Sequence, residues 1–456
     1  MQTPSNTPLW WTTLPDGSSI AVPDDLTVMS RWVLEEQGDW FEDELRFVRR
    51  WFPQGGIAID VGANYGVYTL ALAAKGGSKT RVASFEPTPA VVECLRASLD
   101  RNGFSHVELI EAAVSDRSGR GRLRLGSTSE LSELDSGASE VEGVDVDLVF
   151  LDQWWIDRNR PDVDFLKLDA EGAEVEVLAG AGRMLEACDP LLLCELKHGE
   201  DVNLSMCAAL RRSGRELLRL VPGPQILVPF DEGGPIDGYQ MNILACGPER
   251  ARRLEDDGWL VRSIGTAAGS CSHEELSSWI ADHGDLPEPA DWSGMPADLV
   301  EAISCLVAAT SSTAAASARM SATTRAFELA AGLVDDLTDP AMLASCAEIA
   351  YFAGERTKGN AWLARGTESI FGDPHARHRH PCLQRGVRGE SEPPDLLGLR
   401  TAMLSRLETR LVWSNQFHGL QNDKLLRLSA AMGRLDPAID RRLKLESRVL
   451  RGQARP

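Results

Sequence analysis

One short segment constrains the fold of this chain more than any other: an apolar run that ends in a glycine-bearing loop. The run Ile57–Val61 has the length and composition of a buried strand, and the loop Gly62–Gly66 leads into an apolar helical stretch, Val67–Ala74. Glycines in such a loop let the backbone approach a nucleotide-like ligand closely. The segment therefore predicts the first strand, loop and helix of an α/β sheet that binds such a ligand.

Strand and helix signals then alternate up to about residue 250. The predicted strands are 81–86, 106–111, 120–125, 144–151, 164–169, 191–195, 217–221 and 239–245, and the predicted helices are 89–102, 174–187 and 205–213. Strands that alternate with helices of this length form βαβ units and a parallel sheet with covered faces. Only loops separate the last two strands, which predicts an antiparallel closing hairpin.

A chain of 456 residues is long enough for two or three domains. We predict an N-terminal extension over residues 1–50 and a sheet domain over 51–265. Strand signals stop after about residue 265, and helical patterns take over. We therefore predict an α-helical region over 266–456, with a linker near 372–396.

The charge balance restricts the partners of the chain. The 47 basic and 68 acidic residues leave a formal net charge of −21. This argues against a nucleic-acid partner and against binding to a membrane surface, because proteins bind both through basic surfaces. No apolar run reaches the ~18–20 residues that cross a bilayer, and the first residues lack the regions of a secretory signal. We expect a soluble, cytoplasmic protein without membrane insertion.

Two acids frame the glycine loop. A carboxylate at Glu86, at the end of the second strand, can accept hydrogen bonds from both ribose hydroxyls of an adenosine. Asp60 is placed near the cationic amino-acid end of a ligand such as S-adenosylmethionine. The dinucleotide fingerprint Gly-x-Gly-x-x-Gly is not met, because Asn64 and Tyr65 interrupt the glycine spacing.

With these residues in place, the sequence resembles the FkbM family of S-adenosylmethionine-dependent methyltransferases. The matching segments are 59–66 (IDVGANYG), 85–87 (FEP), 111–116 (EAAVSD), 165–174 (FLKLDAEGAE), 177–180 (VLAG) and 194–195 (CE). The resemblance covers about residues 57–250, and neither residues 1–45 nor the helical half. It implies a class I methyltransferase fold, a Rossmann-like α/β sheet with an antiparallel last strand, and O-methylation of a sugar, glycan or secondary metabolite.

The resemblance also implies the residues that hold the cofactor, S-adenosylmethionine. The loop residues are Asp60, Gly62, Ala63, Asn64 and Gly66; Glu86 is assigned to the ribose, and Ala113 and Val114 to the wall beside the adenine. The expected acceptor is a small molecule or a carbohydrate.

Methyl transfer to a hydroxyl needs a base, because an alcohol is a poor nucleophile. Ligands of open α/β sheets lie at the carboxyl ends of the strands, where the candidates are Asp169, Glu171, Glu195 and His198. We predict Asp169 as the base, with Glu195 or His198 orienting the acceptor. The alternative is His198 itself, since its ordinary pKa near ~6.5 suits a base. No metal is assigned, although Asp169 and Glu171 are also typical ligands of a divalent cation.

Two other functions stay open at this point. The first is N-methylation on the same cofactor, which needs less help from a base. The second is a helical interaction protein whose methyltransferase-like domain is not catalytic. In either case the helical C-terminal region is the candidate surface for a protein partner.

Overall fold

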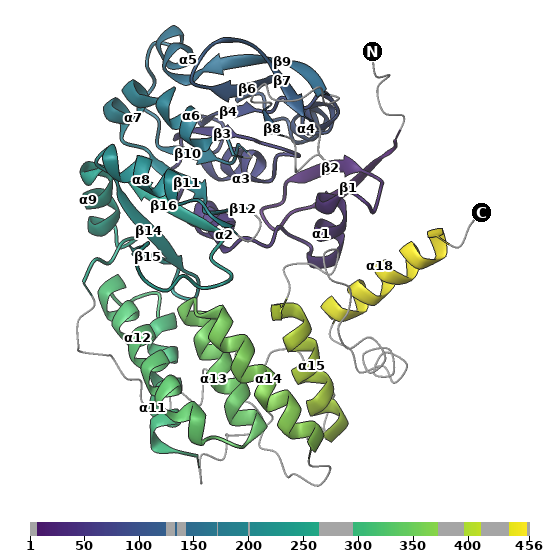
Figure 1. The fold of residues 1–456 in the computed structure, drawn as a ribbon, viewed down its shortest axis with the longest axis vertical. Coiled ribbons are helices and arrows are strands. Elements are labelled where there is room, and N and C mark those ends of the chain that lie inside the picture. The colour runs from purple at the N-terminus through teal and green to yellow at the C-terminus, as the bar shows by residue number, and fades with distance from the viewer. Residues whose placement is uncertain are drawn as a thin grey trace. The chain divides into compact units, whose positions relative to one another are not determined.

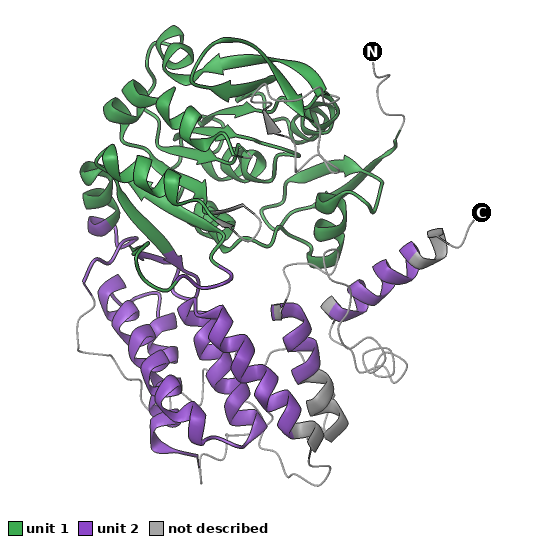
Figure 2. Ribbon diagram, viewed as in Figure 1, with its two compact units in different colours: residues 1–219, 229–235, 240–254 green, residues 220–228, 236–239, 255–456 purple. Residues whose placement is uncertain are grey.

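The computed structural model describes residues 7–124, 133–134, 143–170, 172–198, 201–263, 295–372, 396–411 and 437–453. The chain divides into two compact units, coloured separately in Figure 2. The first comprises residues 1–219, 229–235 and 240–254, so the predicted N-terminal extension is part of it. The second comprises residues 220–228, 236–239 and 255–456. The interior of the predicted linker lies outside the described residues.

An eight-stranded sheet organises the chain up to residue 246 (Figure 1). Its strands are β3 (Ile57–Val61), β4 (Arg81–Phe85), β5 (Val107–Ile110), β10 (Phe165–Leu168), β11 (Leu191–Glu195), β14 (Glu216–Val221), β15 (Ile226–Pro229) and β16 (Asn242–Cys246), in the order β15-β14-β16-β11-β10-β3-β4-β5. Strands β11, β10, β3, β4 and β5 are parallel neighbours, whereas β16 lies antiparallel between β11 and β14. The strand order reverses between β3 and β10, where open α/β sheets form their ligand crevice.

The central strands are apolar because both of their faces are covered. Every residue of β10 is buried, as are the last four residues of β3. Two charged residues interrupt these runs, Asp60 in β3 and Lys167 in β10, and they are paired in register. Charges are rarely buried unless they are paired, so this register position marks a site rather than ordinary core.

Nine helices are described along the same part of the chain. They are α1 (Met29–Gln37), α2 (Asp43–Trp51), α3 (Val67–Gly76), α4 (Pro89–Asn102), α5 (Leu151–Asp157), α6 (Glu174–Ala179), α7 (Gly182–Cys188), α8 (Leu204–Arg212) and α9 (Pro248–Asp256). Helix α4 has its predicted bounds: Pro89 lies in its first turn, and Gly103 ends it in the left-handed conformation.

The single helix predicted over 174–187 is wrong, because the structure divides it into α6 and α7. At the break, a Cβ on Gly180 would lie 2.4 Å from the carbonyl oxygen of Ser115. The carboxylate of Asp152 accepts hydrogen bonds from the backbone N–H groups of Arg183 (2.9 Å) and Met184 (2.8 Å). The second helix is thus started by a side chain that is remote in sequence.

Three smaller strand groups accompany the main sheet. A four-stranded sheet has the order β6-β9-β7-β8, formed by β6 (Ala112–Ser115), β7 (Gly119–Arg124), β8 (Glu133–Leu134) and β9 (Gly143–Phe150). Strands β12 (Lys197–His198) and β13 (Asp201–Val202) form a short hairpin. The hairpin of β1 (Leu9–Thr13) and β2 (Ser19–Pro23) was not predicted from the sequence; it packs on α4, where the Ala21 N–H donates to Ser98 Oγ at 2.9 Å.

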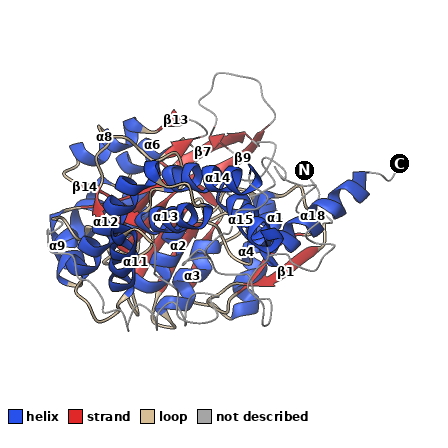
Figure 3. Cartoon of the chain, turned by 90° about the horizontal axis from the view of Figure 1, so that it is seen from below, coloured by secondary structure: helices blue, strands red, loops and turns tan. Residues whose placement is uncertain are grey.

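From residue 295 on, the described part of the second unit consists of helices, drawn in blue in Figure 3 like all helices of the chain, and the loops between them. Its described helices are α11 (Ala297–Thr310), α12 (Ala316–Leu333), the short 3₁₀ turn η2 (Val334–Asp336), α13 (Pro340–Ala353), α14 (Arg356–Gly372), α15 (Leu396–Leu411) and α18 (Pro437–Gln453). Successive helices from α11 to α15 pack on one another. Within the described ranges, no helix has the length and apolar character to cross a membrane.

Two segments that precede residue 240 join this helical unit. The Gly223 N–H donates to the Phe352 carbonyl at 2.9 Å. The carboxylate of Asp237 accepts from both the backbone N–H (2.9 Å) and the hydroxyl (3.0 Å) of Thr357, in the first turn of α14. The boundary between the units is therefore not a single point in the sequence.

Candidate cofactor and active site

The glycines of the loop after β3 are required by close packing. Gly62 and Gly66 have φ values of +70° and +92°, which side-chain-bearing residues rarely adopt. A Cβ on Gly62 would lie 1.8 Å from the carbonyl oxygen of Asp169, and one on Gly66 would lie 2.3 Å from Leu95 Cδ1. The loop is thereby held directly against the end of β10, where Asp169 follows the strand.

Glu86 is fixed by the backbone around it. Its Oε2 accepts from the Asn64 N–H at 2.9 Å, and its Oε1 accepts from the Thr88 N–H at 2.8 Å. Burial raises the pKa of Glu86, and these hydrogen bonds act in the opposite direction. Each carboxylate oxygen has acceptor capacity beyond one hydrogen bond, so this anchored side chain can still bind ligand hydroxyls.

Asp60 is fully buried, and one of its carboxylate oxygens accepts no hydrogen bond. Its Oδ2 accepts from Thr69 Oγ1 at 2.6 Å. Its Oδ1 has no hydrogen-bond partner among the described atoms and lies 3.9 Å from Lys167 Nζ. Burial raises the pKa of Asp60, whereas Lys167 lowers it. A buried carboxylate oxygen without a hydrogen bond is costly, and a ligand ammonium would satisfy it.

Lys167 joins the acids at the ends of β3 and β10. Its Nζ donates to Asp169 Oδ2 at 2.9 Å and to the Gly62 carbonyl at 3.3 Å. Burial alone would lower the pKa of Lys167, but the carboxylates of Asp169 and Asp60 raise it above its ordinary value. Lys167 therefore stays protonated and serves as the positive partner of Asp169, whose side chain is 37% exposed.

The other predicted catalytic residues are described less fully. Glu195 ends β11, paired in register with Asn242 of β16. His198 belongs to β12, where its backbone pairs with Asp201, but its side chain lies outside the described residues. Glu171 also lies outside them. Among the residues that are described, no group of three or more His, Cys, Asp or Glu side chains is arranged to hold a metal ion.

Ala113 and Val114 lie in β6, in the four-stranded sheet rather than the main one. Both side chains are buried, and Ala113 packs in a cluster with Leu123, Val146 and Leu148. The structure thus brings together Asp60, the glycine loop, Glu86 and Asp169. Ala113 contributes its side chain to the core of the smaller sheet.

Sequence reasoning missed three polar residues that surround this cluster: Glu42, Glu44 and Tyr68. Tyr68 Oη donates to Glu42 Oε2 at 2.5 Å, and Trp40 Nε1 donates to Glu42 Oε1 at 3.1 Å. Burial raises the pKa of Glu42, while Tyr68 and Lys167 lower it. Burial, reinforced by Glu42 and Asp43, raises the pKa of Glu44 from 4.5 to about 8.

A signal for Glu44 was present in the sequence. Helix α2 buries Glu44, Leu45, Phe47 and Val48, so this acid lies on the apolar side of an amphipathic helix. An acid at such a position is buried, and a buried acid indicates a paired or functional group.

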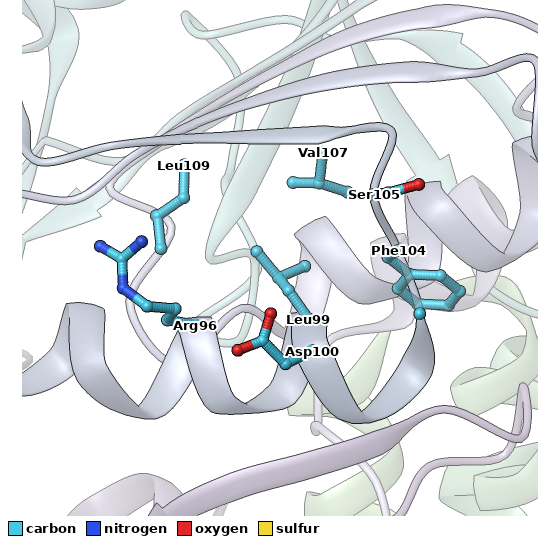
Figure 4. Close-up of a pocket in the computed structure, with 8 residues that line it drawn as sticks. Arg96, Leu99, Asp100, Phe104, Ser105, Val107 and Leu109 are labelled. Carbon is cyan, nitrogen blue, oxygen red and sulfur yellow. The ribbon is translucent and has the colours of Figure 1, made fainter.

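One surface pocket lies away from these residues. It is formed between α4 and β5, and Figure 4 shows Arg96 and Asp100 of the helix facing Val107 and Leu109 of the strand. The guanidinium of Arg96 pairs with Glu111. None of the predicted site residues lines this pocket.

Comparisons with known proteins agree with the predicted family over part of the chain. The family described as methyltransferase FkbM domain matches residues 60–217. A search of curated proteins gives no match. Among solved structures, an FkbM methyltransferase from Methylobacillus flagellatus is 19% identical, with a TM-score of 0.29, and the alignment covers 42% of this chain and 44% of that chain. The alignment thus spans less than half the length of that protein.

Another solved structure, TYW2 from M. jannaschii in complex with AdoMet, is 12% identical with a TM-score of 0.30, and the alignment covers 53% of this chain and 86% of that one. SMU.1697c from Streptococcus mutans, a putative methyltransferase in complex with SAH, is 12% identical with a TM-score of 0.26. The alignment covers 44% of this chain and 94% of that one. The family match includes Asp60, the glycine loop, Glu86 and Asp169. Residues 60–217 of this chain thus match the methyltransferase FkbM domain family.

Proposed function

We propose that this chain is an S-adenosylmethionine-dependent methyltransferase that methylates a hydroxyl of a sugar, glycan or secondary metabolite. The observation that carries the proposal is the fully buried Oδ1 of Asp60, which lies beside the glycine loop and lacks a hydrogen bond. The match of residues 60–217 to the FkbM domain supports the same reaction class. The helical region over 266–456 is proposed as the surface for a protein partner.

The described residues fit the cofactor. Asp60 offers an unsatisfied acceptor for the ammonium of the amino-acid moiety, and Glu86 offers acceptors for the ribose hydroxyls. The loop over 62–66 supplies the close backbone approach, with Ala63 and Asn64 between its glycines. When bound, S-adenosylmethionine supplies an activated methyl group on a sulfonium.

For the chemical step we assign the base to Asp169. Lys167 holds its Oδ2, which fixes the orientation of the carboxylate and leaves Oδ1 to accept a proton from the acceptor hydroxyl. A positioned base of this kind contributes roughly 10²–10⁴-fold to the rate. We assign Glu195 or His198 to the orientation of the acceptor. Glu171, which follows Asp169 by two residues, stays a candidate catalytic residue.

Calorimetric titration with S-adenosylhomocysteine tests the cofactor assignment. We expect micromolar binding that Glu86→Ala abolishes, since hydrogen bonds to a charged acceptor contribute about 1.5–3 kcal/mol each. The matched control is Glu301→Ala, which removes a half-exposed carboxylate in α11. Unchanged binding in Glu86→Ala would exclude Glu86 from the site, and no binding by the parent protein would refute the proposed function.

A labelled methyl donor tests the reaction. Incubation with fractionated lysate from the source organism should yield a labelled product whose methyl group is on oxygen. Asp169→Asn should then reduce turnover about 10²-fold or more, with cofactor affinity nearly unchanged. A product methylated on nitrogen, with turnover insensitive to Asp169→Asn, would support the N-methylation alternative.

A further inference from the structure

Glu42 reaches the cofactor side of the sheet from the N-terminal part of the chain. It immediately precedes α2, and its carboxylate is held by Tyr68 Oη at 2.5 Å. Tyr68 follows Gly66 by two residues, in the first turn of α3, so this contact connects residue 42 directly to the end of the glycine loop. The ammonium of Lys167 lies 5.4 Å from the centroid of the Tyr68 ring.

Acidic side chains outnumber basic ones around this point of the described structure. Four carboxyl groups, those of Glu42, Glu44, Asp60 and Asp169, interact electrostatically with one another or with Lys167. Lys167 is their cation within the described residues, and its closest partner is Asp169 at 2.9 Å. Asp60 Oδ1 is fully buried and lacks a hydrogen bond. That oxygen lies 3.9 Å from Lys167 Nζ, too far for a hydrogen bond, so it can still accept one from a cationic ligand group.

We propose that Glu42, oriented by Tyr68, makes the site selective for the positively charged sulfonium form of the cofactor over the neutral thioether product. This inference rests on the proposed function. In methyl transfer the carbon–sulfur bond breaks and its electron pair stays on sulfur. The methyl carbon bonds to the acceptor oxygen, and the hydroxyl proton passes to Asp169. The cofactor therefore loses one positive charge, and Glu42 takes no part in the proton transfer.

The physical reason for selectivity is the reduced effective dielectric of a partly buried site. A carboxylate there interacts with a cation several-fold more strongly than it would in water, and it gains nothing comparable from a neutral thioether. Glu42 thus favours loading of S-adenosylmethionine and release of S-adenosylhomocysteine. A carboxylate that only anchored the N-terminal segment would affect both ligands equally.

The test is a calorimetric titration of the full-length protein with S-adenosylmethionine and, separately, with S-adenosylhomocysteine. We expect the parent protein to bind the sulfonium form at least about threefold more tightly. Glu42→Gln keeps the shape and an acceptor for Tyr68 but removes the charge. It should weaken binding of the sulfonium form by roughly three- to tenfold and change binding of the thioether less than about twofold.

Glu108→Gln is the matched control. Glu108 lies on β5, is half-exposed and pairs with Arg158, and it has no contact with Tyr68 or Lys167 in the described structure. It should leave the affinity ratio unchanged. Equal losses of both affinities in Glu42→Gln, or an unchanged ratio, would overturn the inference while the proposed function stands. If the parent protein binds neither ligand, both fail.

A measurement on the unmodified protein keeps the inference testable if Glu42→Gln does not fold. Protonation of the carboxyl groups at low pH removes the charge that favours the sulfonium, so the affinity ratio should fall as the pH is lowered. A ratio that does not change with pH would contradict the inference. The groups that face Glu42 are Trp40, Glu44, Tyr68, Lys167 and Asp169.

Discussion

The two units satisfy their buried polar side chains differently. In the helical unit, three buried hydroxyls bond within their own helices: Ser345, Thr367 and Thr323 each donate to the carbonyl oxygen four residues earlier, at 3.0, 2.8 and 2.9 Å. At the carboxyl edge of the sheet, the buried groups are carboxylates such as Asp60 and Glu44. Their partners come from other elements, and one oxygen of Asp60 has none.

This difference indicates which buried groups can still form a hydrogen bond with a ligand. A hydroxyl that donates to a carbonyl oxygen of its own helix already has a hydrogen bond, so it does not need one from a ligand. A buried carboxylate oxygen without a hydrogen bond destabilises the unliganded fold, and that cost is recovered when a ligand donates to it. Asp60 at the sheet edge therefore retains capacity for a ligand, which the three hydroxyls satisfied within their own helices do not.

The largest contrast is expected from glycine substitutions. Gly62→Ala forces a Cβ onto the Asp169 carbonyl at a φ of +70°, so it should lower the free energy of unfolding by roughly 4 kcal/mol or more and abolish cofactor binding. Gly332→Ala, in α12 with no atom within 4 Å of the added Cβ, should raise it by about 0.5–1 kcal/mol. Urea unfolding followed by circular dichroism measures both. A tolerated Gly62→Ala would mean that the loop is not held by this contact.

The pH dependence of stability provides a second contrast. The pKa of Glu44 is raised from 4.5 to about 8, so between these values the unfolded chain releases a proton that the native state keeps. Native stability should therefore fall as the pH rises through this window. Glu44→Gln removes that dependence, so its stability relative to the parent should rise by about 4 kcal/mol between pH 4.5 and pH 8. Parallel unfolding curves of the two proteins across the window would refute the shifted pKa.

The smallest contrast compares single hydroxyls. Thr69→Val removes the hydroxyl that donates to Oδ2 of the fully buried Asp60 at 2.6 Å, which should cost about 1–3 kcal/mol. Ser345→Ala removes a hydroxyl that bonds within its own helix, and the expected cost is about 0.5–1 kcal/mol. Denaturation midpoints give the two values, and equal costs would show that the sheet edge is no more demanding than the helical core.

Local chemistry made part of the fold predictable. Helix α4 begins at Pro89 and ends before Gly103 as expected, because both signals lie within the helix or next to it. The break at Gly180 was not predictable in the same way, since Asp152 and Ser115 create it from other elements. The β1–β2 hairpin was missed for a similar reason: its side-chain anchors, Ser98 and Asn102, lie in α4.

The candidate site also contains residues that the sequence made recognisable and residues that it did not. The loop after β3 and the acid at Glu86 were recognisable because the residues of each βα turn are contiguous. Glu42 and Glu44 were not recognised, because their burial depends on how α2 packs against α3. Tyr68 lay within the recognised segment, but its partner lies 26 residues away in the sequence.

The position of β16 imposes an order on folding during synthesis. Strand β14 leaves the ribosome before β16, yet β16 is the strand that fills the space between β14 and β11. Until residue 246 has emerged, one edge of β11 therefore has no native partner and presents free backbone hydrogen-bonding groups. Such an edge is a template for pairing with other chains, so the nascent protein is exposed to aggregation in the interval between these two strands.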